Sequence, residues 1–305
     1  MHNGMDVAIT GASGFVGRRL AARLLAAGYR LRLLGRTGRL APGTGSENVR
    51  AFAWDPMAGP PPAEAIAGCD AVIHLAGEPV AQRWSDDVKR RIRDSRVTGT
   101  RNLVAGLRAA NPIPETLICA SAVGFYGDRP GETLTESSAA GTGFLPEVCR
   151  EWEREAEAVR ELGVRVAAIR IGLVLGAGGG ALEKMLPPFK MGVGGRLGAG
   201  TQYMPWIHLD DLCALFEFAL DHALHGPLNG SAPNPVTNAE FTRVLAAALH
   251  RPAIFPVPQL AVKVLYGEMS QILFFSQRVL PRAAEAAGFR FQYPELAGAL
   301  ANVLS

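Results

Sequence analysis

Apolar residues recur along the chain in blocks separated by polar and glycine-rich segments. Short uninterrupted blocks predict buried strands, and blocks with helical spacing predict amphipathic helices. Strands are expected at residues 7–9, 31–34, 49–54, 71–77, 166–175 and 228–232. Helices are expected at residues 18–27, 212–220, 239–249, 260–273 and 282–287, with an extended segment at 252–258. Strands that alternate with helices predict an α/β fold with a parallel sheet, in which the run 71–77 forms the central strand.

A glycine-rich turn, within the stretch ITGASGFVG, joins the first strand to the first helix. Gly11 allows the chain to turn, Gly14 lets the backbone approach a pyrophosphate, and Gly17 lets the helix pack on the sheet. The amides at the helix N-terminus would then face the phosphates. This arrangement predicts a doubly wound Rossmann-type sheet that binds a dinucleotide; an ordinary turn with incidental glycines is the alternative.

The residues at the end of the second strand distinguish between dinucleotides. Asp or Glu there accepts hydrogen bonds from a ribose 2′-hydroxyl, whereas Arg pairs with a 2′-phosphate. The chain has Gly35, Arg36 and Thr37 at this point, with Arg39 as a further basic residue. Arg36 therefore favours NADP; a solvent-facing Arg after a strand is the alternative.

Composition narrows the partner class. The chain has 305 residues, of which 48% are hydrophobic and 19% are charged, so it can bury a large core, and its length suggests about two domains. The net charge of +3 and the pI near 8.8 come from scattered arginines rather than from a basic stripe with interleaved aromatics. Nucleic acid is therefore not an expected partner.

Cysteine spacing and the lack of long apolar runs suggest a location. Cys69, Cys119, Cys149 and Cys213 lie far apart, without a C-x-x-C pair, which argues against a zinc site and against a disulfide framework. We expect free thiols, no bound metal and a cytoplasmic protein. No signal-like segment precedes the first strand, and no apolar run reaches the roughly 20 residues of a membrane span, so no membrane association is expected.

Several motifs follow one another in a recognisable order. They are TGASGFVG, CDAVIHLAG, SRVTGTRNLV, SAVGFYGD, AAIRIGLVLG, PWIHLDDL and the tail GEMSQILFFSQRVLPRAAEAAGFRFQYPEL. In this order they resemble the extended short-chain dehydrogenases/reductases, and within them the atypical branch labelled epimerase-family or SulA-like proteins. The resemblance covers nearly the whole chain, including a tail that forms a domain of unknown function in that branch. It implies NADP binding and a Rossmann fold with a smaller C-terminal α/β substrate lobe, but no settled reaction.

The resemblance also implies domain boundaries. The NADP-binding Rossmann domain is expected at residues 5–175, completed by 205–232, and the substrate lobe at 176–204 and 233–305. The glycine-rich segment 176–180 at their junction lacks the Gly-Lys-Ser/Thr of a Walker loop. A lid over the substrate and a linker are both open interpretations of it.

The resemblance further implies cofactor contacts. The pyrophosphate is expected at the first glycine turn and the 2′-phosphate at Arg36. The adenine is expected near Asp55, and the nicotinamide side near Arg96 and Leu173. The complete set of expected cofactor-binding residues is Gly11, Ser13, Gly14, Phe15, Val16, Gly17, Gly35, Arg36, Asp55, Leu75, Ala76, Gly77, Arg96 and Leu173. Close sheet packing would also explain Ala76 and Gly77, and an exposed helix position would also explain Arg96.

This chain lacks the residues that carry out the proton transfer usual in the superfamily. There a Tyr with a Lys four residues later transfers the proton, because the Lys cation lowers the pKa of the Tyr. No Tyr in this chain is followed by such a Lys. In the helix that should carry them, PEVCREWEREAE, Cys149 and Glu153 stand in their places. The usual Ser maps to Ala122, with Ser121 one position earlier.

The catalytic residues therefore stay unassigned, with four weak candidates. Glu153 would raise the pKa of Cys149, which argues against an activated thiolate, and a buried structural cysteine is the alternative. Ser121 and Tyr126 are candidates for a residual polar pocket. Glu153 itself is a candidate general base.

Three positions in the C-terminal half are expected to serve structure. Asp210 or Asp211 is expected to cap the helix at 212–220, and Asn238 the helix at 239–249. His208 is expected to be a hydrogen-bonded hinge residue rather than a catalyst.

Together these features predict an NADP(H)-binding oxidoreductase or epimerase-like enzyme that acts on a small carbonyl or sugar-like substrate. The alternative is a catalytically silent protein that binds NADP(H) and responds to it. The sequence identifies no particular substrate, and it leaves a homodimer open.

Overall fold

The computed structural model describes residues 4–39 and 47–305. At its centre is a seven-stranded parallel sheet with the strand order β11-β7-β5-β4-β1-β2-β3. The strands are β1 (Asp6–Thr10), β2 (Arg30–Gly35), β3 (Val49–Ala53), β4 (Ala71–His74), β5 (Thr116–Ala122), β7 (Arg165–Ile171) and β11 (Gly226–Gly230). The strand order reverses between β1 and β4, which is where doubly wound sheets bind ligands. The α/β fold and the central place of β4 are as predicted.

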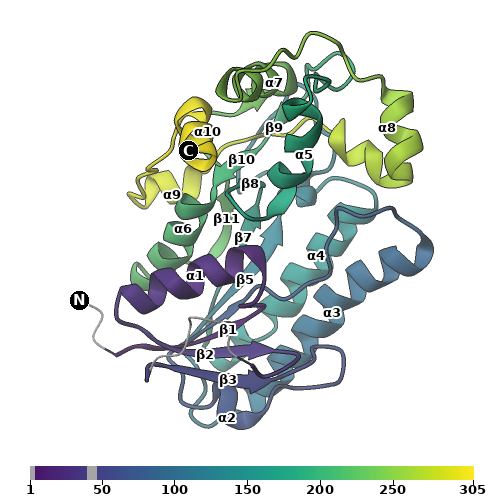
Figure 1. The fold of residues 1–305 in the computed structure, drawn as a ribbon. Helices are drawn as coiled ribbons and strands as arrows, with labels where there is room; N and C mark the ends of the chain where they lie inside the picture. The colour runs from purple at the N-terminus through teal and green to yellow at the C-terminus, as the bar shows by residue number, and fades with distance from the viewer. Residues whose placement is uncertain (1–3, 40–46) are drawn as a thin grey trace.

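Helices cover both faces of the sheet (Figure 1). One face carries α1 (Phe15–Ala26), α6 (Leu209–Asp221) and α9 (Arg282–Ala286). The other face carries α2 (Ala63–Ile66), α3 (Asp86–Ala109) and α4 (Phe144–Glu157). The short 3-10 turns η1 (Val123–Tyr126) and η2 (Arg160–Leu162) flank α4.

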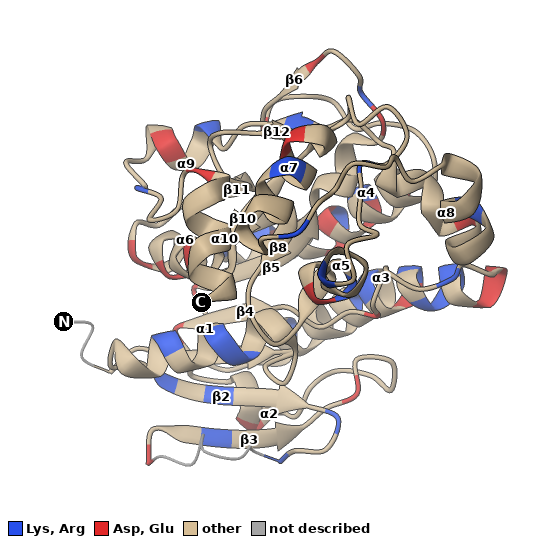
Figure 2. Cartoon of the chain, turned by 45° about the horizontal axis from the view of Figure 1, so that its top comes forward, with Lys and Arg blue, Asp and Glu red and all other residues tan. Residues whose placement is uncertain are grey.

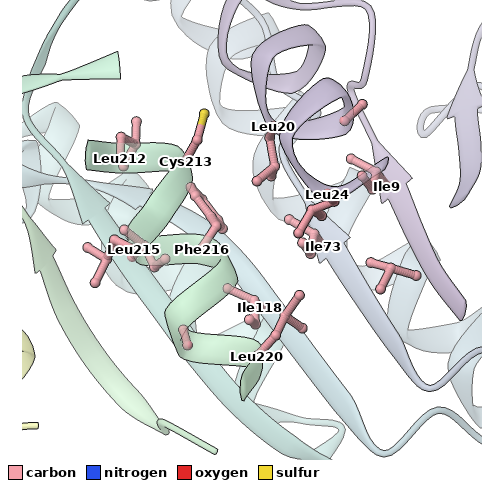
Figure 3. Close-up of a cluster of buried hydrophobic side chains, with 14 of the residues drawn as sticks. Ile9, Leu20, Leu24, Ile73, Ile118, Leu212, Cys213, Leu215, Phe216 and Leu220 are labelled. Atoms are coloured by element: carbon pink, nitrogen blue, oxygen red, sulfur yellow. The ribbon is translucent and has the colours of Figure 1, made fainter. Parts of the chain in front are cut away.

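The alternation of side chains along the strands fills a core on each face. Ile9 of β1 joins the core under α1 and α6, whereas the adjacent Ala8 joins the core under α2, α3 and α4. Figure 3 shows the first of these cores, in which Leu24 of α1 and Phe216 of α6 lie over Ile73 and Ile118 of the sheet. This packing fixes α1, whose N-terminus follows the glycine turn.

A separate hydrophobic core lies in the upper part of Figure 1. It is built from β8 (Leu173–Leu175), α5 (Gly180–Lys190), β10 (Trp206–His208), α7 (Asn238–Ala248) and α10 (Leu296–Leu304). Two further strand pairs flank it: β9 (Tyr203–Met204) with β12 (Val236–Thr237), and β6 (Thr133–Leu134) with β13 (Arg278–Val279). The helix α10 is an element that the sequence analysis did not predict.

The single strand predicted at 166–175 is wrong, because the chain leaves the sheet at Gly172. The amide of Gly172 donates to the Gly230 carbonyl, and a Cβ at this position would lie 2.6 Å from the Pro205 carbonyl oxygen. After this close approach β8 pairs with β10 instead of extending β7. Leu173 thus belongs to the upper core.

The helix predicted at 260–273 also divides. It consists of α8 (Gln259–Tyr266) followed by the 3-10 turn η3 (Gly267–Leu273). Gly267 has φ +64°, a left-handed conformation that ends an α-helix. From η3, Met269 packs with Trp84 and Ile92, so the tail contacts the start of α3.

Neither predicted aspartate caps α6. The cap is His208, whose Nδ1 accepts from the Asp210 amide at 3.0 Å. Asp210 instead pairs with Arg19 of α1 at 2.6 Å. Its neighbour Asp211 is buried and accepts the amides of Gln292 and Tyr293, which fastens the tail to α6.

The cap of α7 is likewise one residue earlier than predicted. Thr237 accepts the Glu240 amide at 3.2 Å, and the Asn238 side chain accepts the Leu197 amide at 2.7 Å. Thr and Asn both suit a cap, so their order alone does not determine which one serves.

Candidate cofactor and active site

The glycine turn after β1 is shaped by two close backbone approaches. Gly11 has φ +69°, and a Cβ there would lie 2.8 Å from the Ala76 nitrogen beyond β4. A Cβ at Gly17 would lie 2.3 Å from the Gly11 carbonyl oxygen. Only glycine avoids both contacts, so these residues hold the end of β1, the end of β4 and the start of α1 together.

Gly14 differs because open space lies in front of it. It is the N-cap of α1 and supplies no capping side chain. Its own amide bonds to the Gly11 carbonyl at 2.9 Å, and an added Cβ would have only that carbonyl oxygen, at 3.2 Å, within 4 Å. Ser13 beside it is exposed, and Val16 is half-buried. The free amides and the helix dipole make this end of α1 suited to an anion.

Phe15 places the glycine-rich segment 176–180 beside the same turn. Its ring would lie 2.5 Å from a Cβ at Gly179, and 2.9 and 2.8 Å from a Cβ at Gly176 and Gly180. These glycines leave the room that the ring fills. The segment therefore packs across the start of α1 and leads into α5, whose N-terminus also lacks a capping side chain.

Arg36 lies at the end of β2 and is exposed. Within residues 4–39 and 47–305 its guanidinium has no hydrogen bond or ion pair, and a Cβ added to the preceding Gly35 would meet nothing within 4 Å. Asp55, after β3, is also exposed and accepts the Met57 amide at 3.0 Å. The ends of β2 and β3 thus present a free cation and a carboxylate.

A buried histidine that the sequence analysis did not single out connects the strands beside this turn. His74 Nδ1 lies 2.7 Å from Thr10 Oγ1, and His74 Nε2 lies 3.1 Å from Thr100 Oγ1 of α3. Thr10 Oγ1 also accepts the amides of Leu75 and Ala76 at 3.2 and 3.3 Å. Burial, assisted by the charge of Arg96, lowers the pKa of His74 to about 4, so the ring is neutral. A polar residue inside the apolar run 71–77 was the signal in the sequence.

Near the carboxyl ends of β5 and β7, Glu153 of α4 is engaged by Arg170 of β7, a residue missed by the sequence analysis. Arg170 Nε and Nη2 donate to the two carboxylate oxygens at 2.9 and 2.8 Å. Ser121 Oγ donates to Glu153 Oε1 at 2.6 Å. Arg170 is only 4% exposed, and its partner raises its pKa although burial opposes this. The cation opposite Glu153 thus comes from the sheet, not from the helix that carries Glu153.

Tyr126 belongs to the same network and is completely buried. Its hydroxyl accepts from Arg170 Nη1 at 3.0 Å and lies 2.7 Å from Asn229 Oδ1, to which it donates. Burial is the main cause that raises the pKa of Tyr126. Glu136 completes the arrangement by accepting the Asn229 amide at 3.0 Å. The structure therefore joins Ser121, Tyr126 and Glu153 but encloses them.

Cys149 lies one turn before Glu153 on α4 and is buried. Burial first, and the charge of Glu153 second, raise its pKa to about 12, so the thiol is neutral. The direction of the Glu153 effect is as expected from the sequence.

Residues 7–230 match the model of the NAD dependent epimerase/dehydratase family, and residues 257–303 match a domain of unknown function (DUF1731). The chain belongs to the NAD dependent epimerase/dehydratase family. The resemblance to the epimerase-family branch of short-chain dehydrogenases/reductases is thereby confirmed.

Relatives in this family match over nearly the full chain. An epimerase family protein SDR39U1 homologue, chloroplastic, from Arabidopsis thaliana is 40% identical over 98% of this chain and 87% of its own length. Epimerase family protein YfhF of Bacillus subtilis is 36% identical over 99% of this chain and 98% of its own. The crystal structure of human epimerase family protein SDR39U1 with NADPH superposes with a TM-score of 0.88 at 33% identity, covering 98% and 99% of the two chains.

No helix in the described part of the chain is long and apolar enough to cross a membrane. No group of three or more His, Cys, Asp or Glu residues within 4–39 and 47–305 is arranged to hold a metal ion. Charged residues of both signs lie along α3 (Figure 2). On this helix Arg90 pairs with Asp87, and Lys89 pairs with Glu268 of η3.

Proposed function

We propose that this protein binds NADP(H) and reduces a small polar carbonyl compound with NADPH. One observation carries the proposal: the open N-terminus of α1 at Gly14 together with the unpaired guanidinium of Arg36. Both features bind phosphate, and they lie at the ends of β1 and β2, where a dinucleotide-binding sheet presents them. The human relative crystallised with NADPH supports the cofactor.

The residues present fit this cofactor. The amides that follow Gly14 would hold the pyrophosphate, and Arg36 would pair with the 2′-phosphate. Leu75, Ala76 and Gly77 would line the ribose, since Thr10 and His74 fix the backbone at the end of β4. Arg96 and Leu173 would lie toward the nicotinamide. When bound, the cofactor supplies the hydride.

The arrangement around Glu153 favours reduction of a substrate that needs no proton donor from the protein. Ser121 donates its hydrogen to Glu153, Arg170 holds both oxygens of that carboxylate, and the Tyr126 hydroxyl is enclosed. None of the three offers a free proton to a substrate, so water supplies it. A carbonyl that is already polarised needs less from the protein than a sugar hydroxyl that must be deprotonated reversibly.

The same enclosure supports a second candidate from a different class. A protein that binds NADPH but has its former proton-transfer site closed by the Glu153–Arg170 pair would act as a sensor of the cofactor. In such a protein the residues at the start of α1 would bind the cofactor, and the residues around Glu153 would serve only stability.

We also propose a cytoplasmic location, supported by the four buried free cysteines.

Binding and turnover separate the two candidates. Calorimetry with NADPH tests the cofactor, and the absorbance of NADPH in the presence of a library of carbonyl compounds tests reduction. Oxidation of NADPH by one compound class, lost in Gly14→Val, supports the enzyme. Tight NADPH binding without turnover across the library favours the sensor, and absence of NADPH binding contradicts both.

A further inference from the structure

Arg96 of α3 is held beside the proposed nicotinamide end. Its Nη1 donates to the carbonyl oxygens of Glu78 and Ile92 at 2.9 and 3.1 Å. Its Cζ lies 5.1 Å from the centroid of the Trp152 ring, and a Cβ at Gly77 would lie 3.4 Å from Cζ and Nη2. Three elements therefore fix the guanidinium: α3, α4 and the segment after β4.

This held cation has no anionic partner in the part of the chain that the structure describes. No carboxylate oxygen of the described residues lies within 4.0 Å of its guanidinium nitrogens. The nearby carboxylate of Glu78 accepts from Gln82 at 3.1 Å and lies 3.7 Å from Arg91 instead. Burial lowers the pKa of Arg96, because it is held partly out of water without a counterion.

The unsatisfied atoms of Arg96 form a matched pair. Nη1 is occupied by two carbonyls, whereas Nε and Nη2 donate to no atom among the described residues. Nε and Nη2 are the two donors on one edge of the planar guanidinium, and their spacing fits the two oxygens of a carboxylate. Arg170 uses this same edge, Nε and Nη2, to hold Glu153.

We propose that the Nε and Nη2 edge of Arg96 binds a carboxylate of the substrate, so that the substrate is a small oxo acid. The inference rests on the proposed function and specifies its substrate class. Arg96 is half-buried, and Gly77, whose added Cβ would lie 3.4 Å from Nη2, is exposed, so solvent reaches part of the guanidinium. The phosphates of the cofactor are assigned to the α1 N-terminus and Arg36, which leaves Arg96 for the second ligand.

Calorimetric titration tests the proposal without relying on turnover. Oxamate serves as the carboxylate probe, inorganic phosphate as the tetrahedral anion, and acetamide as the neutral analogue; each is titrated into the protein with and without saturating NADPH. Arg96→Gln removes the charge, Arg96→Lys keeps it without the paired donors, and Arg90→Gln is the control, an exposed arginine of the same helix.

We expect oxamate to bind the unaltered protein and the control, and to bind Arg96→Gln about tenfold or more weakly, with Arg96→Lys between them. The affinity for NADPH should change less than about threefold in all variants. NADPH is measured separately, so failure of the cofactor proposal shows as absent NADPH binding, whatever the oxamate result.

The inference would be overturned if oxamate did not bind the unaltered protein, or if it bound Arg96→Gln equally well. Tighter binding of phosphate than of oxamate would also overturn it. A parallel loss of NADPH affinity in Arg96→Gln would assign Arg96 to the cofactor instead.

Thermal melting checks that Arg96→Gln is folded. A cation without a counterion contributes little to stability, so the Tm of Arg96→Gln should not fall by more than about 4 °C. A larger fall together with retained oxamate affinity would assign Arg96 to the fold.

Discussion

At the N-terminus of α1 a Cβ added to Gly14 would have only the Gly11 carbonyl oxygen within 4 Å, whereas around Arg170 the charged and hydroxyl groups bond to one another. Both regions lie at the carboxyl edge of the same parallel sheet, one after β1 and the other between β5 and β7. Polar groups without partners are free to bind a ligand, and satisfied ones mainly fix the fold. The difference indicates that the start of α1 has room for a ligand, whereas the groups around Arg170 hold the fold together.

Arg170, which is buried, and Arg96, which is half-buried, show the same contrast between two side chains of one kind. Arg170 has a carboxylate on its Nε and Nη2 edge, and its pKa is raised. Arg96 has carbonyls on Nη1 alone, and its pKa is lowered. The same side chain thus has opposite electrostatic consequences, because only one of the two has an internal counterion.

The largest effect is expected when the hydrogen-bonded network around Arg170 is broken. Arg170→Met leaves Glu153, whose side chain is only 15% exposed, without its cation, and breaking a largely buried pair in this way costs about 3–5 kcal/mol. The free energy of unfolding, measured in urea, should fall by this amount. Arg170→Met combined with Glu153→Leu should recover most of the loss. Arg282→Met, which breaks the exposed pair with Glu285, is the control and should cost under about 1 kcal/mol. A small loss for Arg170→Met would show that the network is not structural.

The next effect is a dependence of stability on pH that originates between the two regions. The pKa of His74 falls from 6.5 to about 4 in the folded protein, so the unfolded chain binds more protons between these values. The contribution of neutral His74 to the free energy of unfolding is therefore fully present above pH 6.5. As the pH falls toward 4 this contribution is lost, which lowers the free energy of unfolding by about 3 kcal/mol. Unfolding free energies across this range should show the loss, and His74→Gln should flatten it. An unchanged slope in His74→Gln would assign the dependence to other groups.

The proposed phosphate site at the start of α1 is tested by Gly14→Val. The added side chain would occupy the space before the α1 amides, so NADPH affinity should fall about a hundredfold or more while the Tm stays unchanged. Calorimetry and thermal melting measure the two quantities. Gly298→Ala, on α10 with nothing within 4 Å of an added Cβ, is the matched control. Undiminished NADPH affinity in Gly14→Val would place the ligand elsewhere.

The smallest effect concerns the choice of cofactor. If Arg36 pairs with the 2′-phosphate, NADPH should bind about tenfold more tightly than NADH, since a charge-assisted hydrogen bond contributes about 1.5 kcal/mol or more. Arg36→Ala should remove most of this preference and leave NADH binding unchanged. Equal affinities of the unaltered protein for NADPH and NADH would contradict the assignment.

The sequence by itself determined the turn at Gly11, Gly14 and Gly17, the central strand β4 and the absence of a Tyr and Lys pair at the usual spacing. Each of these is local: a glycine conformation, an apolar run, or a spacing along one helix. The place where a strand leaves its sheet was beyond local reasoning, because Gly172 turns away where it meets the distant Pro205 carbonyl.

Only the tertiary structure decided what replaces the missing pair. Glu153, Ser121 and Arg170 come from α4, β5 and β7, and Tyr126 bonds to Asn229, 103 residues away in the chain. The sequence shows that such groups exist but not which of them meet, because hydrogen bonds and ion pairs depend on distances of about 3 Å that long-range packing sets. For the same reason the sequence could name Arg96 as a residue of interest, while the contacts on its Nη1 and the free edge of its guanidinium became visible only in the folded chain.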